Sequence, residues 1–187
     1  YKVSGGLHGL GISVVNELSE WVEVIVQRDG HVYKQKFAFG KKATELEVIG
    51  DSQNTGTQVT FLPDKNIFET TNFQYDILAN RLRELAFLNA GLKIQIIDVR
   101  NNKEETFQYE GGVKSFVQFL NKSKTPIVQD VIYFRKEKEK TEVEIAMQYN
   151  DGYQENIFSF VNNINTIEGG THLEGFKTAL TRTINTY

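Results

Sequence analysis

The sequence predicts an α+β fold in which strands pair mainly in antiparallel fashion. Strand-like segments that alternate apolar and polar residues are joined by hairpin turn signals, and helical patterns stand in separate blocks. The chain has 187 residues, of which 40% are hydrophobic and 24% charged, as is usual for a globular protein. A glycine pair, Gly111-Gly112, predicts a boundary between a domain over 1–111 and a domain over 112–187, although one mixed domain is an alternative.

The first predicted domain combines short alternating strands with two helices. Apolar residues at helical spacing indicate each helix, and Asp29-Gly30 is a strong hairpin signal. The longer helix ends at Asn89-Ala90-Gly91, which is a typical C-terminal sequence. The predicted elements are a helix over 9–19, strands over 21–26, 31–39, 46–50 and 57–62, a helix over 75–89, and strands over 92–99 and 104–110.

The second predicted domain has the same mixture. Charges of alternating sign over 135–141 favour an exposed turn, and Asn150-Asp151-Gly152 indicates a second hairpin turn. The predicted elements are a helix over 113–123, strands over 131–134 and 143–149, an extended segment over 155–163, and a helix after the glycines of 169–170.

Four glycines within seven residues mark the segment 5–11, directly before the first helix. Main-chain N–H groups that lead into a helix N-terminus form an anion site, and glycine lets phosphate oxygens approach the backbone. A tight turn between a strand and a helix explains the glycines equally well. The segment is not a P-loop, because no Lys-Ser/Thr pair follows, and it lacks the third small residue of the Rossmann fingerprint.

Composition excludes several other classes of site. The chain has no cysteine, so it has neither disulfides nor thiolate metal ligands. Its three histidines are widely spaced, its net charge is −3, and no apolar run reaches the roughly 20 residues that a membrane span needs. The chain begins at Tyr1 without a methionine, and we expect it to be part of a longer protein.

A family resemblance covers almost the whole chain. SGGLHGLGISVVNELS resembles the glycine-rich box of the GHKL ATPases, in the form found in type IIA topoisomerases. NTGTQVTFLPD, RLRELAFLNAGLKI, YEGGVKSFVQFLN and QYNDGYQENIFSFVNNINTIEGGTHLEGFKTALTRTIN are similar to segments of the bacterial DNA gyrase B family. The E subunit of topoisomerase IV is the close alternative, and a MutL-type repair ATPase is a more distant one.

The resemblance implies a fold and a cofactor. Residues 1–111 would be the C-terminal part of a GHKL-type ATP-binding α/β sandwich, and 112–187 the first part of a ribosomal-S5-like transducer domain. ATP and Mg²⁺ are the implied cofactors, and the Mg²⁺ ligand is expected upstream of this chain. Nine residues would contact ATP, with the loop amides on the triphosphate: Tyr1, Gly6, Leu7, His8, Gly9, Leu10, Gly11, Thr57 and Val59.

Each of these side chains also has an ordinary structural explanation. Tyr1 would reach the adenine, but it stands at a chain end. His8 would lie near the phosphates, or it caps and packs. Thr57 would support adenine recognition and Val59 would form an apolar wall, or they are a plain strand threonine and a core valine.

The resemblance places no catalytic residue in this chain. The general base is expected upstream and a lysine that contacts the γ-phosphate beyond Tyr187, so we expect the isolated chain to have no ATPase activity. A non-catalytic nucleotide-binding and relay module is the alternative interpretation of the isolated chain. The resemblance implies that the longer protein of which this chain is a part, here called the parent protein, acts in the cytoplasm. It would form a homodimer, and its partners would be the A subunit of gyrase and DNA, with no membrane involved. Lys177 and Arg182 would face the DNA cavity, or they belong to a solvated helix face.

Overall fold

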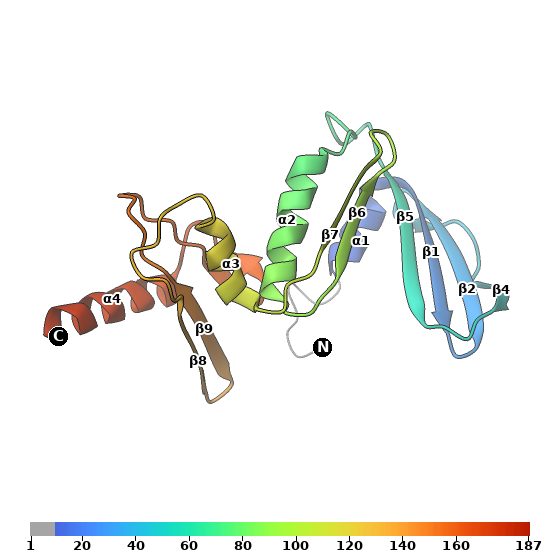
Figure 1. Ribbon diagram of the computed structural model, residues 1–187. Helices are drawn as coiled ribbons and strands as arrows, with labels where there is room; N and C mark the ends of the chain where they lie inside the picture. The colour runs from blue at the N-terminus through green and yellow to red at the C-terminus, as the bar shows by residue number, and fades with distance from the viewer. Residues whose placement is uncertain (1–9) are drawn as a thin grey trace. The chain divides into compact units, whose positions relative to one another are not determined.

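A computed structural model describes residues 10–187 and divides the chain into two compact units. The first unit runs to Asn72 and the second spans Phe73–Tyr187 (Figure 1). Predictions for residues 1–9 lie outside the described part of the chain. All strand pairs among the described residues are antiparallel, and the α+β prediction is confirmed by the mixture of helices and antiparallel strands.

The first unit is one helix followed by a five-stranded sheet (Figure 1). The strand order is β3-β2-β1-β5, and β4 also pairs with β2. Asp29 and Gly30 both have left-handed backbone conformations (φ 52° and 84°), as the two-residue turn between β1 and β2 requires. The elements are α1 (Leu10–Glu17), β1 (Ser19–Arg28), β2 (His31–Ala38), β3 (Lys41–Lys42), β4 (Glu47–Asp51) and β5 (Gly56–Pro63).

Alternation along the strands gives this sheet two different faces. The register sets Val24 opposite Val59 and Val26 opposite Thr57, so these four residues share one face. We call it the valine face. Trp21 and Glu23 point to the other face, because successive strand residues alternate in direction.

The second unit packs helices on small antiparallel hairpins. The strands pair as β6–β7, β8–β9 and β10–β11, three separate two-stranded sheets. The elements are α2 (Tyr75–Leu88), β6 (Ile94–Asp98), β7 (Lys103–Phe107), α3 (Gly112–Leu120), β8 (Ile132–Lys138), β9 (Thr141–Met147), β10 (Phe160–Val161), β11 (Ile164–Asn165) and α4 (Thr171–Thr186).

The core of the second unit lies between α2 and the β6–β7 hairpin. Ala79 and Ala86 of α2 are buried together with Phe107 of β7, and Leu82 and Ile96 pack against them. The small alanines allow close packing on the hairpin, and the helix spacing of the apolar residues explains why this face is inside. The helix ends where Asn89 Nδ2 donates to the Leu85 carbonyl at 2.8 Å.

Two local predictions for the second unit were wrong. The charged segment 135–141 is not a turn: β8 runs to Lys138, β9 begins at Thr141, and the turn is only two residues long. Cross-strand pairs hold it, since Arg135 Nη2 lies 2.7 Å from Glu142 Oε2 and Tyr133 donates to Glu144 at 2.9 Å. Strand hydrogen bonds and cross-strand pairs thus override the polar composition.

The second wrong prediction concerns Asn150-Asp151-Gly152. This segment is not a hairpin turn, because β9 pairs with β8 and Asn150 forms a single bridge with Pro126. The amide oxygen of Asn150 instead accepts a hydrogen bond from the Gly152 backbone N–H at 2.9 Å, a local turn. The actual hairpin turn, at Asn162-Asn163, joins β10 to β11.

Candidate nucleotide-binding site

The predicted phosphate loop is described only at its C-terminal end. Five of the predicted residues lie outside the described part of the chain: Tyr1, Gly6, Leu7, His8 and Gly9. Leu10 and Gly11 are described, and they form the first turn of α1. The proposed contacts of all seven with ATP stay predictions.

The first turn of α1 is open. Leu10 is 53% exposed, and among the described residues a Cβ added at Gly11 would meet no atom within 4 Å apart from its chain neighbours and its own helix backbone. The first N–H groups of a helix have no partner within the helix and carry partial positive charge. Among residues 10–187, therefore, no neighbouring atom requires a glycine at position 11.

The other end of α1 is fastened to the sheet. Asn16 Nδ2 donates to the Gly40 carbonyl at 3.2 Å, and Ser19 Oγ donates to the Val15 carbonyl at 2.5 Å. The Asp64 backbone N–H donates to the Leu18 carbonyl at 3.0 Å. These bonds fix the helix beside the end of β5, so the direction of its N-terminus is set by the sheet.

Thr57 and Val59 lie two residues apart on β5 and share the valine face. The Val59 side chain is 38% exposed, so this face can receive a ligand or further chain. Phe61 lies on the same face, opposite Val22, and sequence reasoning did not name it. The alternation Thr57, Val59, Phe61 was the signal that would have found it.

The predicted residues form two groups. Leu10 and Gly11 are together on α1, and Thr57 and Val59 are together on β5. Within residues 10–187 no hydrogen bond joins the two groups. Thr57 is near the start of β5, whereas the C-terminal end of α1 is fastened near Pro63, the last residue of β5.

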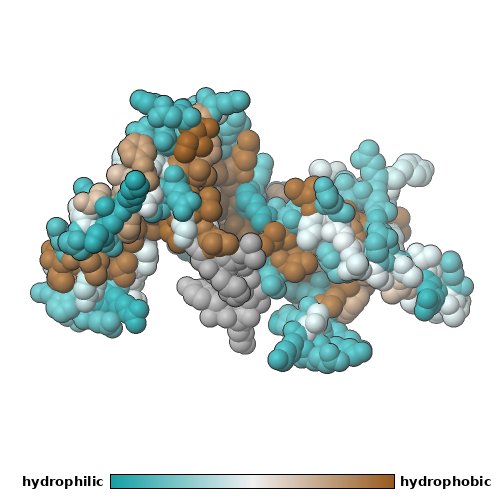
Figure 2. All heavy atoms as spheres, turned by 180° about the vertical axis from the view of Figure 1, so that it is seen from behind, coloured by the Kyte–Doolittle hydropathy of each residue, from teal (hydrophilic) through white to brown (hydrophobic). Residues whose placement is uncertain are grey.

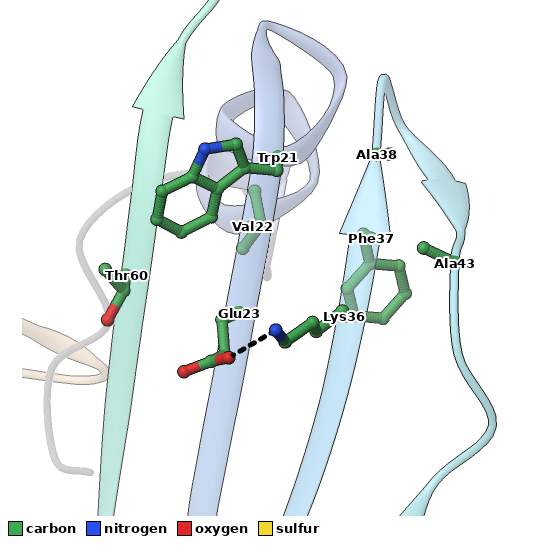
Figure 3. Close-up of a pocket in the computed structure, with 8 residues that line it drawn as sticks. All are labelled: Trp21, Val22, Glu23, Lys36, Phe37, Ala38, Ala43 and Thr60. Atoms are coloured by element: carbon green, nitrogen blue, oxygen red, sulfur yellow. Dashed lines mark ion pairs between the residues drawn. The ribbon is translucent and has the colours of Figure 1, made fainter.

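A cavity of about 420 Å³ in the first unit does not contain the predicted residues. Figure 3 shows Glu23 of β1 pointing toward Lys36 of β2. The Glu23 carboxylate lies 2.8 Å from Lys34 Nζ and 3.2 Å from Lys36 Nζ. Both lysines lower the pKa of Glu23 by hydrogen bonding to its carboxylate, and Lys34 has the larger effect. The charged side chains at this cavity are thus paired with each other within the sheet. The lining residues are Trp21, Val22, Glu23, Lys36, Phe37, Ala38, Ala43 and Thr60.

The residues predicted to face DNA lie on α4. Lys177 and Arg182 line one groove of about 410 Å³ together with Thr178 and Thr181. Lys177 Nζ is 2.8 Å from Glu155 Oε1, and this hydrogen bond raises the pKa of Lys177. The pair partly neutralises the lysine, so Arg182 is the stronger candidate for a phosphate contact.

Residues 10–187 contain neither a cluster of potential metal ligands nor a helix suited to a bilayer. No group of three or more His, Asp or Glu side chains is arranged as metal ligands. None of the helices in this range is long and apolar enough to span a bilayer. Hydrophobic residues nevertheless reach the surface, as the brown areas of Figure 2 show. Phe61 and Leu62 of β5 are also partly exposed.

Comparison with known proteins identifies relatives over the whole chain. The DNA gyrase B family model matches residues 112–187. The B subunit of DNA gyrase from Clostridium acetobutylicum is 59% identical over 188 residues, which cover 100% of this chain and 30% of that protein. The B subunit of DNA topoisomerase 4 from Bacillus subtilis is 53% identical, with 100% of this chain and 28% of that protein covered.

Solved structures agree with these relatives. The 43K ATPase domain of Thermus thermophilus gyrase B, solved with an aminocoumarin, superposes with a TM-score of 0.84 and 40% identity, covering 96% of this chain and 50% of that chain. The gyrase B-subunit of Myxococcus xanthus has the same fold, with a TM-score of 0.84 at 24% identity, and covers 90% of this chain and 50% of that one. The chain spans about 30% of the length of the first curated relatives that it matches. By sequence over its whole length and by fold, the chain is similar to the B subunits of DNA gyrase, and the family's own model matches residues 112–187.

Proposed function

We propose that the chain is part of the ATPase subunit of a type IIA DNA topoisomerase, DNA gyrase, in which ATP-driven closure of a dimer gate is coupled to DNA strand passage and supercoiling. The observation that carries this proposal is the 59% identity to a B subunit of DNA gyrase, which extends over the complete chain. The superposition on a gyrase B ATPase domain supports it independently.

Two groups of residues would hold the nucleotide. The amides of Gly6 to Gly11, next to the open first turn of α1, suit a triphosphate, because the helix N-terminus favours anions. Thr57 would support adenine recognition with its hydroxyl, and Val59 would form an apolar wall beside it on the same face. ATP bound with Mg²⁺ supplies the phosphoryl group for hydrolysis. Tyr1 and His8 complete the proposed set.

The proposed enzyme would act together with other macromolecules. The A subunit of gyrase, DNA and a second copy of the ATPase-bearing protein are the partners of the parent, which would act in the cytoplasm. Arg182, and more weakly Lys177, would contribute positive charge toward DNA. The relatives that are B subunits of DNA gyrase support this assignment.

A calorimetric titration with a non-hydrolysable ATP analogue tests the proposed site. We expect weak binding to this chain and tighter binding to a chain extended upstream, because the missing part of the site is expected there. In the extended chain Thr57→Ala should weaken binding about fivefold, as for one lost hydrogen bond. Thr60→Ala is the matched control on the opposite face of β5. An extension without added affinity, or equal losses in both variants, would contradict the proposed site.

Topoisomerase IV is a second candidate, supported by one specific relative. The B subunit of this enzyme from Bacillus subtilis is 53% identical over the whole chain. The two candidates differ in reaction, since one introduces supercoils and the other separates linked DNA circles. Assays of both reactions with the reconstituted parent enzyme decide between them: ATP-dependent negative supercoiling supports gyrase, and efficient decatenation without supercoiling supports topoisomerase IV.

A further inference from the structure

We propose that the β10–β11 hairpin is a latch that fastens residues 112–187 to the C-terminal end of α2 through Asn163. The latch consists of Asn163, Arg81 and Asn89. In terms of the enzyme proposed above, these are positioning residues that carry movement from the nucleotide-binding part of the chain to the part that follows Gly111-Gly112.

The backbone carbonyl and the side-chain NH₂ group of Asn163 both form hydrogen bonds to α2 and its C-terminal end. Arg81 Nη2 donates to the Asn163 carbonyl at 3.2 Å, and Asn163 Nδ2 donates to Asn89 Oδ1 at 2.9 Å. Arg81 is held in place by an ion pair with Glu84 one turn along α2, and Asn89 by its bond to the Leu85 carbonyl. The hairpin therefore meets side chains that are already oriented by the helix.

The β10–β11 hairpin is short, and the turn that presents Asn163 is closed by hydrogen bonds at its base. Asn162 and Asn163 are both left-handed (φ 49° and 66°), the geometry of a two-residue turn that asparagine tolerates better than most residues. At its base, the Ser159 and Thr166 hydroxyls lie 2.6 Å apart, and the Thr166 N–H donates to the Ser159 carbonyl at 2.8 Å. The position of the Asn163 carbonyl is therefore set by the hairpin, not by a long loop.

An aromatic cluster joins the same two parts of the chain. The buried Phe87 ring of α2 stacks on Tyr109 with centroids 3.6 Å apart and on Phe116 of α3 at 5.1 Å. Phe116 in turn lies 5.5 Å from Phe158, just before the hairpin. Apolar contacts give cohesion but little direction, whereas hydrogen bonds fix orientation. The aromatic cluster therefore holds residues 112–187 against α2, and the hydrogen bonds of the latch fix their orientation relative to α2.

The consequence for mechanism follows from chain order and rests on the proposed function. The helix α2 is the next element after β5, the strand of Thr57 and Val59, and 112–187 contains α4 with Arg182. When the hydrogen bonds of the latch are formed, α2 and residues 112–187 move together as one rigid unit. An unlatched protein still binds and hydrolyses ATP, but the movement is transmitted less completely.

The test compares two glycine variants in the full-length parent protein, reconstituted with its partner. Asn163→Gly removes the latch amide and Asn162→Gly, one residue away, does not, while glycine suits the positive φ at both positions. We expect Asn163→Gly to hydrolyse ATP within about twofold of the parent but to lose about fivefold in supercoils introduced per ATP, the scale of one lost hydrogen bond acting on a two-state equilibrium. Asn162→Gly should behave as the parent does.

Arg81→Lys gives an independent arm of the test. Lysine keeps the charge but cannot bond Glu84 and the Asn163 carbonyl together as the guanidinium does, so we expect the same loss of coupling. Unchanged coupling in Asn163→Gly, or an equal loss in Asn162→Gly, would overturn the latch.

If the full-length parent protein shows no ATP-dependent strand passage, this result contradicts the proposed function and does not test the latch. In that case the latch is tested by a double-mutant cycle of Asn89→Ala and Asn163→Gly on urea unfolding of the full-length parent protein. A coupling of about twofold or more in the unfolding constant supports the contact, and additive effects overturn it.

Discussion

Asp98, the last residue of β6, holds the β6–β7 turn to the start of the second unit. Its carboxylate accepts hydrogen bonds from Arg100 Nε and Nη2, both at 2.9 Å, and from Asn101 Nδ2 at 3.1 Å. Arg100 Nη2 also donates to the Phe73 carbonyl at 2.8 Å, just before α2. The Arg100 side chain, and then Asn101, hold the pKa of Asp98 well below its usual range.

This residue predicts a specific response to acid. A depressed carboxylate pKa in the folded state contributes stability that is present above about pH 4 and lost as the pH falls further. We expect the free energy of unfolding to fall steeply below about pH 4 in the unsubstituted chain and less steeply in the Asp98→Asn variant. Urea unfolding across this range measures it. Asp130→Asn, at an exposed position, should follow the parent, and parallel curves for Asp98→Asn and the parent would contradict the assignment.

At the level of the elements, the junction between β7 and α3 depends on the backbone of one glycine. The helix α3 begins at Gly112, which is buried and left-handed with φ 56°. A Cβ there would meet Ala90 Cβ and the Phe87 carbonyl at 3.8 Å, an ordinary contact distance. The requirement for glycine is therefore one of backbone conformation and not of space.

A pair of alanine variants tests this requirement. We expect Gly112→Ala to lower the free energy of unfolding by about 1 kcal/mol, the cost of a left-handed conformation for a residue with a Cβ. Gly175→Ala lies within α4, where an added Cβ meets nothing within 4 Å, and should raise stability by up to about 1 kcal/mol. Chemical denaturation of both variants measures the difference, and a stabilising Gly112→Ala would show that the junction does not need this backbone.

At the scale of the whole molecule, the chain consists of two compact units with different contents. The first holds the sheet with Thr57 and Val59, and the second holds α2, the aromatic cluster and the latch. The domain boundary predicted at Gly111-Gly112 stays a prediction. Because Phe87 and Phe116 pack across that position, the residues on its two sides share part of their core.

The whole-molecule prediction concerns activity. We expect this 187-residue chain alone to show no measurable ATP hydrolysis, since phosphoryl transfer depends on positioned charges that the family resemblance places elsewhere in the parent. A coupled ATPase assay measures turnover of the chain, with the full-length parent protein as positive control. Turnover comparable to that of the parent would show that the chain itself carries the catalytic groups.

Local patterns predicted the elements whose signals are contained in a few neighbouring residues. The Asp29-Gly30 turn and the apolar stripe of α2 were found in this way. The charged part of β8 was missed because alternating signs contain no apolar period, and pairing with β9 makes it a strand. The hairpin at Asn162-Asn163 was missed because its turn lacks the usual glycine. In the candidate site, Thr57 and Val59 were predicted by resemblance, whereas Phe61 was not named, although its alternation with them is already present in the sequence.

The amino-acid sequence by itself determined the fold class, the order of most elements, the family and the glycine-rich segment, because periodicity, turn residues and motifs are local properties of a chain. Only the tertiary structure decided that β5 pairs with β1 and β4 with β2, that Lys177 is bonded to Glu155, and that Asn163 meets Arg81 and Asn89. Asn89 and Asn163 are 74 positions apart in the chain. Such contacts depend on strand register and core packing, which arise when the chain closes on itself.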